Sequence, residues 1–106
     1  MRTEEFLIEL DEGMLDYFRQ IAEEMVGRFG ISRAEAVARI NATYEGEEIE
    51  PYPDLMCHEP AKYWAYGLYF EPREGQLPYG APGENLSEWA VRPAPPADSH
   101  VWTLKE

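Results

Sequence analysis

The chain is short of the residues that would mark an exported protein or a membrane protein. Of its 106 residues, one is cysteine, and a single cysteine cannot form an internal disulfide. No stretch approaches the roughly 18–20 apolar residues that a membrane span needs. Charged side chains interrupt the first ten residues, so this part does not resemble a signal peptide. We therefore expect a protein of the reducing cytoplasm, with no membrane partner.

The chain also lacks the short motifs of common chemistries. It contains no glycine-rich phosphate loop, no Gly-x-Ser-x-Gly elbow and no plausible catalytic triad. Structural zinc sites usually show paired Cys or His at short spacing, and the chain has no CxxC, HxxxH or HExxH. These absences predict no catalytic residue, no metal and no cofactor, and they favour a protein that is not an enzyme.

Positive charge is scarce. Nine Lys and Arg face 21 Asp and Glu, for a net charge of −12. Residues 1–50 hold 13 acids and 5 bases, and residues 51–106 hold the other 8 acids and 4 bases. Such a surface repels nucleic-acid phosphate and anionic lipid. We expect no nucleic-acid partner, and a protein partner that is basic; the alternative is that the acidity serves solubility alone.

Proline is absent before Pro51, and the proline-free part shows helical periodicity. Apolar residues between positions 14 and 29 recur on one face of a helix. Asp11 suits the N-cap of this helix and Gly30 suits its end. Ser32 and Glu35 have the spacing of a capping box. The sequence therefore predicts amphipathic helices at about 12–29 and 32–45, which must pack closely because their link is short.

Residues 3–10 are ambiguous. Phe6, Ile8 and Leu10 alternate with Leu7 and Glu9, which is typical of a short strand. Leu7 and Leu10 also fit the apolar stripe of the following helix, so an early helical start is the alternative.

All nine prolines lie at or after Pro51, which predicts an irregular, Pro-rich C-terminal half. The exception is the stretch 54–70, which ends in five aromatics within eight residues. Pro60 suits the first turn of a helix, although Tyr63–Phe70 is rich in β-formers. We favour a short aromatic helix at about 60–70 and a loop over 71–85. The fold class predicted is mainly α, in one domain over residues 1–106.

The stretch 54–70 also holds the candidate site. Cys57, His58 and Glu59 suggest either a thiol nucleophile beside a base or, with His100, a partial metal site. The alternative is a buried cysteine beside a capping or hydrogen-bonded histidine.

Aromatic side chains are the second group of candidates. Tyr and Trp are enriched at interfaces and in ligand pockets, because each joins a large apolar area to a polar tip. The candidate binding residues of this group are Tyr63, Trp64, Tyr66 and Tyr69. We expect Trp64 to be buried and some of the tyrosines to be presented at a surface, as a pocket or as the face of a homodimer.

Residues 4–44 resemble a ribbon-helix-helix repressor. The resemblance is carried by the alternating segment, then Leu10-Asp11-Glu12, a helix, Gly30-Ile31-Ser32-Arg33-Ala34-Glu35 and a second helix. It implies a DNA-binding transcriptional regulator. The strand that enters the DNA groove in that family carries basic or amide side chains, whereas this chain has Glu4, Glu5 and Glu9 there. We therefore adopt only the helix–corner–helix arrangement, and a regulator is our third hypothesis.

Residues 15–70 are also similar to a group of small bacterial proteins without assigned activity. The residues that carry this resemblance are Gly30-Ile31-Ser32, Glu35-Ala36-Val37, Arg39-Ile40-Asn41, His58-Glu59 and Tyr63-Trp64-Ala65. It implies a shared fold and no chemistry.

Two functional hypotheses remain ahead of the regulator. The first is a non-enzymatic acidic protein-interaction module, for example an immunity- or antitoxin-like inhibitor of a basic effector. The second is a small ligand- or metal-binding protein, or an enzyme, that uses Cys57, His58, Glu59 and a tyrosine-lined pocket.

Overall fold

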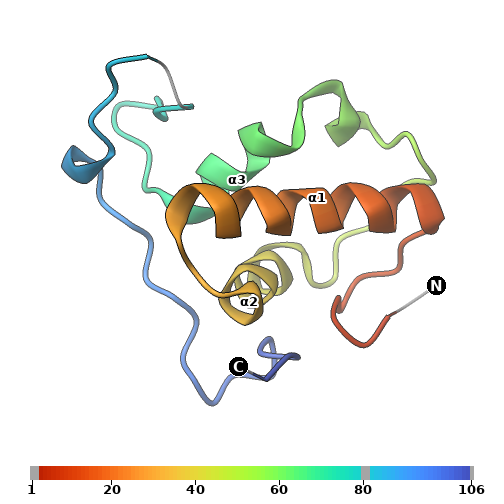
Figure 1. The fold of residues 1–106 in the computed structure, drawn as a ribbon. Coiled ribbons are helices and arrows are strands. Elements are labelled where there is room, and N and C mark those ends of the chain that lie inside the picture. The colour runs from red at the N-terminus through yellow and green to blue at the C-terminus, as the bar shows by residue number, and fades with distance from the viewer. Residues whose placement is uncertain (1–2, 80–81, 106) are drawn as a thin grey trace.

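A computed structural model describes residues 3–79 and 82–105. Its helices are α1 (Glu12–Phe29), α2 (Arg33–Tyr44) and α3 (Ala61–Tyr69), with 3-10 turns η1 (Leu55–His58) and η2 (Leu86–Glu88). Helix α1 lies in the middle, with α3 on one side and α2 on the other (Figure 1). The mainly α fold is confirmed, and each predicted helix agrees with the structure to within one residue at either end.

Local sequence signals explain where the first two helices begin and end. The Asp11 carboxylate accepts a hydrogen bond from the backbone N–H of Met14 at 2.9 Å, and the Ser32 hydroxyl accepts from that of Glu35 at 3.0 Å. Gly30 ends α1 in the left-handed conformation, with φ of 69°, where glycine has no Cβ penalty.

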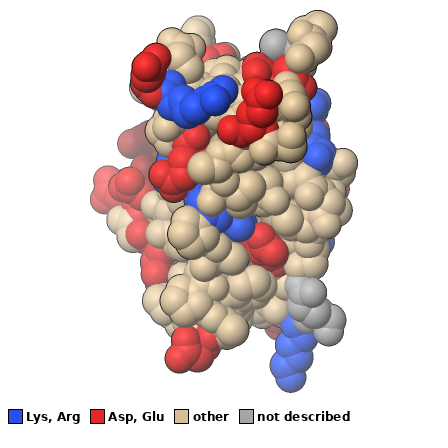
Figure 2. Space-filling model, turned by 90° about the vertical axis from the view of Figure 1, so that its left-hand side faces the viewer, with Lys and Arg blue, Asp and Glu red and all other residues tan. Residues whose placement is uncertain are grey.

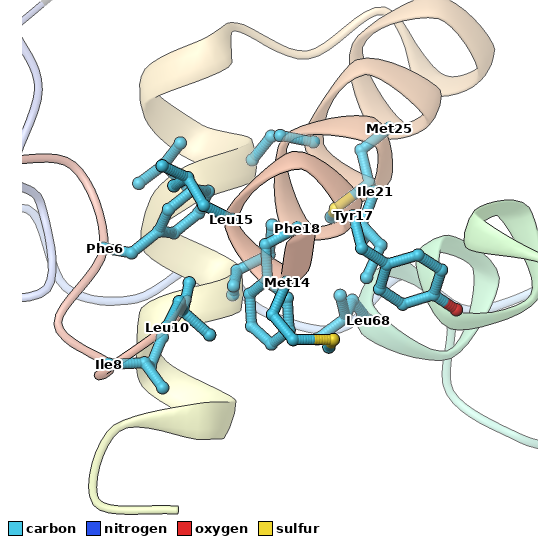
Figure 3. Close-up of a cluster of buried hydrophobic side chains, with 14 of the residues drawn as sticks. Phe6, Ile8, Leu10, Met14, Leu15, Tyr17, Phe18, Ile21, Met25 and Leu68 are labelled. Atoms are coloured by element: carbon cyan, nitrogen blue, oxygen red, sulfur yellow. The ribbon is translucent and has the colours of Figure 1, made fainter. Parts of the chain in front are cut away.

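The main core forms around the apolar face of α1. Phe6 and Phe18 meet edge to face at 5.8 Å between ring centroids, and Leu68 reaches the same cluster from α3. Figure 3 shows side chains of the N-terminal segment facing those of α1. The fully buried members of this cluster are Phe6, Met14, Phe18, Ile21, Ala22, Met25, Ala36, Val37, Ile40 and Ala65.

The short strand considered for residues 3–10 is not formed. Phe6, Ile8 and Leu10 are buried, as their alternation indicates. The backbone N–H of Leu7, however, donates to the side chain of Asn41 at 2.9 Å. The pattern predicted the buried face correctly, but the segment pairs with a helix side chain instead of a neighbouring strand.

The C-terminal half wraps over the helices as an irregular chain, as predicted (Figure 1). Phe70 and Val91 form an isolated antiparallel bridge, and Tyr66, Phe70 and Trp89 make a second, smaller core. The predicted loop over 71–85 is irregular where it is described; its residues 80–81 lie outside the described part. Within the described ranges, none of the helices combines the length and the apolar content that crossing a bilayer requires.

Candidate functional site

A groove lies between the end of α2 and the start of α3. Its volume is about 620 Å³, and it is closed on one side by the connector that runs from α2 to η1. The side chains on its floor and walls are mostly apolar: Tyr44, Ile49, Leu55, Met56 and Trp64. Carboxylates and one imidazole complete the lining: Glu47, Glu48, Asp54, His58 and Glu59.

Hydrogen bonds from three elements hold the groove in shape. The carbonyl of Met56 accepts from the Tyr17 hydroxyl on α1 and from the indole N–H of Trp64 on α3, both at 2.9 Å. The Asp54 carboxylate accepts from the backbone N–H groups of Met56 at 2.9 Å and Glu50 at 2.8 Å. These contacts join the turn to two helices and to the connector, and so fix the shape of the groove.

One wall of the groove is unusually open. Leu55 is 88% exposed, although leucine is among the residues most often buried. A single exposed leucine is ordinary on a protein surface, but this one stands beside Met56 and Trp64, which also line the groove. The hollow is therefore an open groove and not an enclosed small-molecule cavity.

The rim is strongly acidic. A second hollow of about 660 Å³ lies on the other side of the connector and shares Glu47, Glu48 and Ile49 with the first. Further acids, Glu9, Glu45 and Glu50, line it. Among the described residues that line either hollow, none is Lys or Arg.

Five of the described arginines pair with acids outside the groove. The described ion pairs of arginine are Arg19–Glu5, Arg33–Glu5, Arg28–Glu24, Arg39–Glu35 and Arg92–Glu71. Figure 2 shows the left-hand side of the view in Figure 1, where basic and acidic side chains are interspersed. The groove is lined in part by the connector and η1, and these two segments lie on the right of Figure 1. None of these described ion pairs involves an acid that lines the groove.

Tyr44 adds no charge to the groove at neutral pH. Burial, followed by the nearby negative charge of Glu47, raises the pKa of its phenol to about 12. The ring packs edge to face on Phe18, at 5.4 Å between centroids, so it serves as apolar wall.

Cys57, His58 and Glu59 lie together at the edge of a further hollow of about 550 Å³, on the α1 side of η1. Burial raises the pKa of the Cys57 thiol, and the charges of Asp54 and Asp11 raise it further. The Cys57 thiol donates a weak hydrogen bond to the Met14 Sδ at 3.5 Å. These surroundings favour the neutral thiol, which is the weak form of a nucleophile.

The aromatic candidates divide between core and surface. Tyr66 is 2% exposed and belongs to the smaller core, whereas Tyr63, Trp64 and Tyr69 are half-buried. Tyr63 stacks on Tyr79 at 5.0 Å. Trp64 was expected to be buried; its indole instead forms one wall of the groove.

Tyr69 is held between helices. Its ring stacks on that of Phe29, with 4.3 Å between the ring centroids. The Arg39 guanidinium lies over the Tyr69 ring, 4.9 Å from its centroid. Neither Tyr66 nor Tyr69 lines the groove. Of the seven candidate residues, His58, Glu59 and Trp64 are the ones brought to it.

The contribution of the connector to the groove was not predicted from the sequence. Glu47, Glu48, Ile49 and Leu55 had no motif to single them out, and Glu47 with Glu48 resembled ordinary solvated charge. The sequence signal for this part of the groove was the acidic pair Glu47 and Glu48 followed by Ile49 and Leu55, two isolated aliphatic residues outside the predicted helices.

Among the described residues, no group of three or more His, Cys, Asp or Glu is arranged to hold a metal ion. Comparison of the chain with protein-family models, with curated proteins and with solved structures finds no match.

Proposed function

We propose that this protein is a non-enzymatic interaction module that binds a basic segment of a partner protein in the groove between α2 and α3. The observation that carries the proposal is an open apolar lining, with Leu55 88% exposed, bordered by carboxylates and by no described Lys or Arg. Apolar side chains of the partner would fill the floor, and its Lys or Arg would meet the rim.

Electrostatic complementarity supports this partner class. Opposite potentials across an interface select the partner and suppress wrong ones. The net charge of −12 also attracts a basic partner, over a longer range than the rim acids do. An immunity- or antitoxin-like inhibitor of a basic effector is one form of such a module, in a cytoplasm that keeps the single thiol reduced.

The experiment is a selection of binders from a random peptide library on the whole protein. Peptides that also bind a Leu55→Ser variant are removed. Val91→Ser is the matched control, because Val91 is another exposed large apolar residue, at 45%, and does not line the groove. We expect the remaining peptides to be rich in Lys or Arg and in apolar residues, and to bind the Val91→Ser variant normally.

The rim is tested with the same peptides. Glu47→Gln with Glu48→Gln should weaken binding by about three- to tenfold, because exposed charge pairs contribute ~0.2–1 kcal/mol each. Added salt should weaken it as well. Glu74→Gln with Glu88→Gln, two exposed acids outside the groove, is the control. Remaining peptides without basic residues, or a selection in which no peptide remains after the Leu55→Ser binders are removed, would contradict the proposal.

A further inference from the structure

We infer that the segment bound in the groove is an amphipathic α-helix of the partner, with one apolar stripe flanked by Lys or Arg. This inference rests on the proposed function and adds the conformation of the bound segment. It follows from the backbone hydrogen-bond partners at the groove and from the acidic charge of its rim.

An extended segment needs backbone partners. Peptides that bind in extended form usually add a strand to an exposed sheet edge, where main-chain hydrogen bonds give the affinity. The described residues that line the groove include no strand. The carbonyl of Met56, on the groove floor, already accepts two hydrogen bonds, from Tyr17 and Trp64.

The hydrogen bonds of the turn also use one backbone N–H group at the groove and two beside it. Those of Glu50 and Met56 donate to the Asp54 carboxylate, and that of Cys57 donates to the Asp54 carbonyl at 2.9 Å. A buried backbone group without a partner costs about as much as a lost hydrogen bond. An occupant that satisfies its own backbone, as a helix does, needs no further hydrogen-bond partner from the groove.

The shape of the lining agrees with a helix. Apolar side chains come from three directions: Tyr44 from the end of α2, Leu55 and Met56 from η1, and Trp64 from α3. A helix presents anchors at spacings of three and four residues along one stripe. Residues beside the stripe then lie over the rim acids Glu47 and Glu59, where Lys or Arg is favoured.

Other occupants fit the rim less well. A second copy of this chain in a two-fold contact would place the same acidic rims face to face, and like charges in contact disfavour association. An anionic lipid surface is repelled for the same reason. A basic partner helix is the occupant whose charge complements Glu47, Glu48, Asp54 and Glu59.

The test uses the tightest peptide from the library selection and three derivatives. Proline in the middle of the peptide should weaken binding about a hundredfold, because it breaks a helix at a cost of ~3 kcal/mol. Proline at the first position of the expected helix is the matched control and should leave binding unchanged. A side-chain staple across one turn, on the polar face, should strengthen binding, because it reduces the ordering cost.

The outcomes separate this inference from the proposed function. The inference is wrong if the peptide with the central proline binds normally, or if the stapled peptide does not bind while the parent peptide still binds in a Leu55-dependent way. The bound form is then extended, although the groove remains the binding site. If no peptide depends on Leu55, the proposed function itself fails. Helical circular dichroism that increases on complex formation would support the inference independently.

Discussion

The hydroxyl of Tyr17, on α1, donates a hydrogen bond to the carbonyl of Glu59 at 2.7 Å. The carbonyl oxygen of Met56 lies 2.9 Å from the same hydroxyl, so the two carbonyls share its single proton. One phenol on the central helix thus holds both ends of the turn that carries the floor of the groove. Burial raises its pKa to about 12, so it remains a donor throughout the physiological range.

Tyr17→Phe is predicted to destabilise the protein by about 1–2 kcal/mol, because an intramolecular hydrogen bond contributes ~0.5–1.5 kcal/mol and two carbonyls lose this donor. Urea unfolding measures the change. Peptide binding in the groove should weaken too, since the turn loses its tie to α1. Tyr52→Phe, at an exposed position, is the control; an effect of equal size there would contradict this role for Tyr17.

Glu5 is predicted to make stability depend on acid pH. Burial alone raises the pKa of its carboxyl, but the hydrogen bonds and charges of Arg19 and Arg33 outweigh burial, and the pKa lies below its ordinary 4.5. A carboxyl whose pKa is lower in the folded than in the unfolded state stabilises the fold at pH values above its unfolded pKa. This contribution to stability is lost as the pH falls through the folded pKa. The stability difference between the wild type and Glu5→Gln should therefore be largest near neutral pH and shrink below 4.5.

Urea midpoints over a pH series measure that difference. Glu4→Gln changes an exposed neighbour and should follow the wild type at every pH. A difference between wild type and Glu5→Gln that stays constant with pH would show that the carboxylate charge is not responsible.

Asn41 is predicted to be one of the most sensitive positions in the chain. It is fully buried, accepts from the N–H of Leu7 at 2.9 Å, and donates to the carbonyls of Glu5 and Val101 at 3.0 and 3.1 Å. Asn41→Leu leaves these groups without that partner, so we expect a loss of about 2–4 kcal/mol. Thr43→Val, exposed on the same helix, should change stability by less than ~0.5 kcal/mol.

Urea unfolding measures this loss, and limited proteolysis locates it. Residues near Val101 should become accessible to protease first, because Asn41 holds them to α2. Equal stability of Asn41→Leu and Thr43→Val would show that the amide contributes nothing.

Cys57 is predicted to be slow in alkylation. Its pKa is raised above the ordinary 9.0, first by burial, so less thiolate is present at neutral pH than in an unfolded chain. The rate of reaction with a soluble maleimide should be about tenfold lower in the native protein than in urea, as expected for a partly buried thiol of raised pKa. A native rate above the rate in urea would restore Cys57 as a candidate nucleophile.

Helix boundaries could be predicted because their causes are local. Asp11, Gly30 and Ser32 act within a few residues of themselves, and the burial of Phe6, Ile8 and Leu10 follows from their spacing alone. The strand considered there could not be decided from that spacing, since the partner of Leu7 is 34 positions away, at Asn41.

The groove was harder to predict for the same reason. Its floor depends on Tyr17, which lies 39 positions from Met56, and such a pairing leaves no mark in either local sequence. Leu55 reads as a core residue by composition. Only the fold shows that it is 88% exposed, and that Trp64 stands beside it as a wall.

The hydrogen bonds between the two ends of the described chain determine when folding can be completed during synthesis. The hydroxyl of Thr103 donates to the carbonyl of Glu5 across 98 positions, and Val101 meets Asn41 across 60. During synthesis, α1 and α2 leave the ribosome long before these partners do. Until then Asn41 is a polar group in an unfinished core, so the nascent chain completes its fold only after residue 103 has emerged.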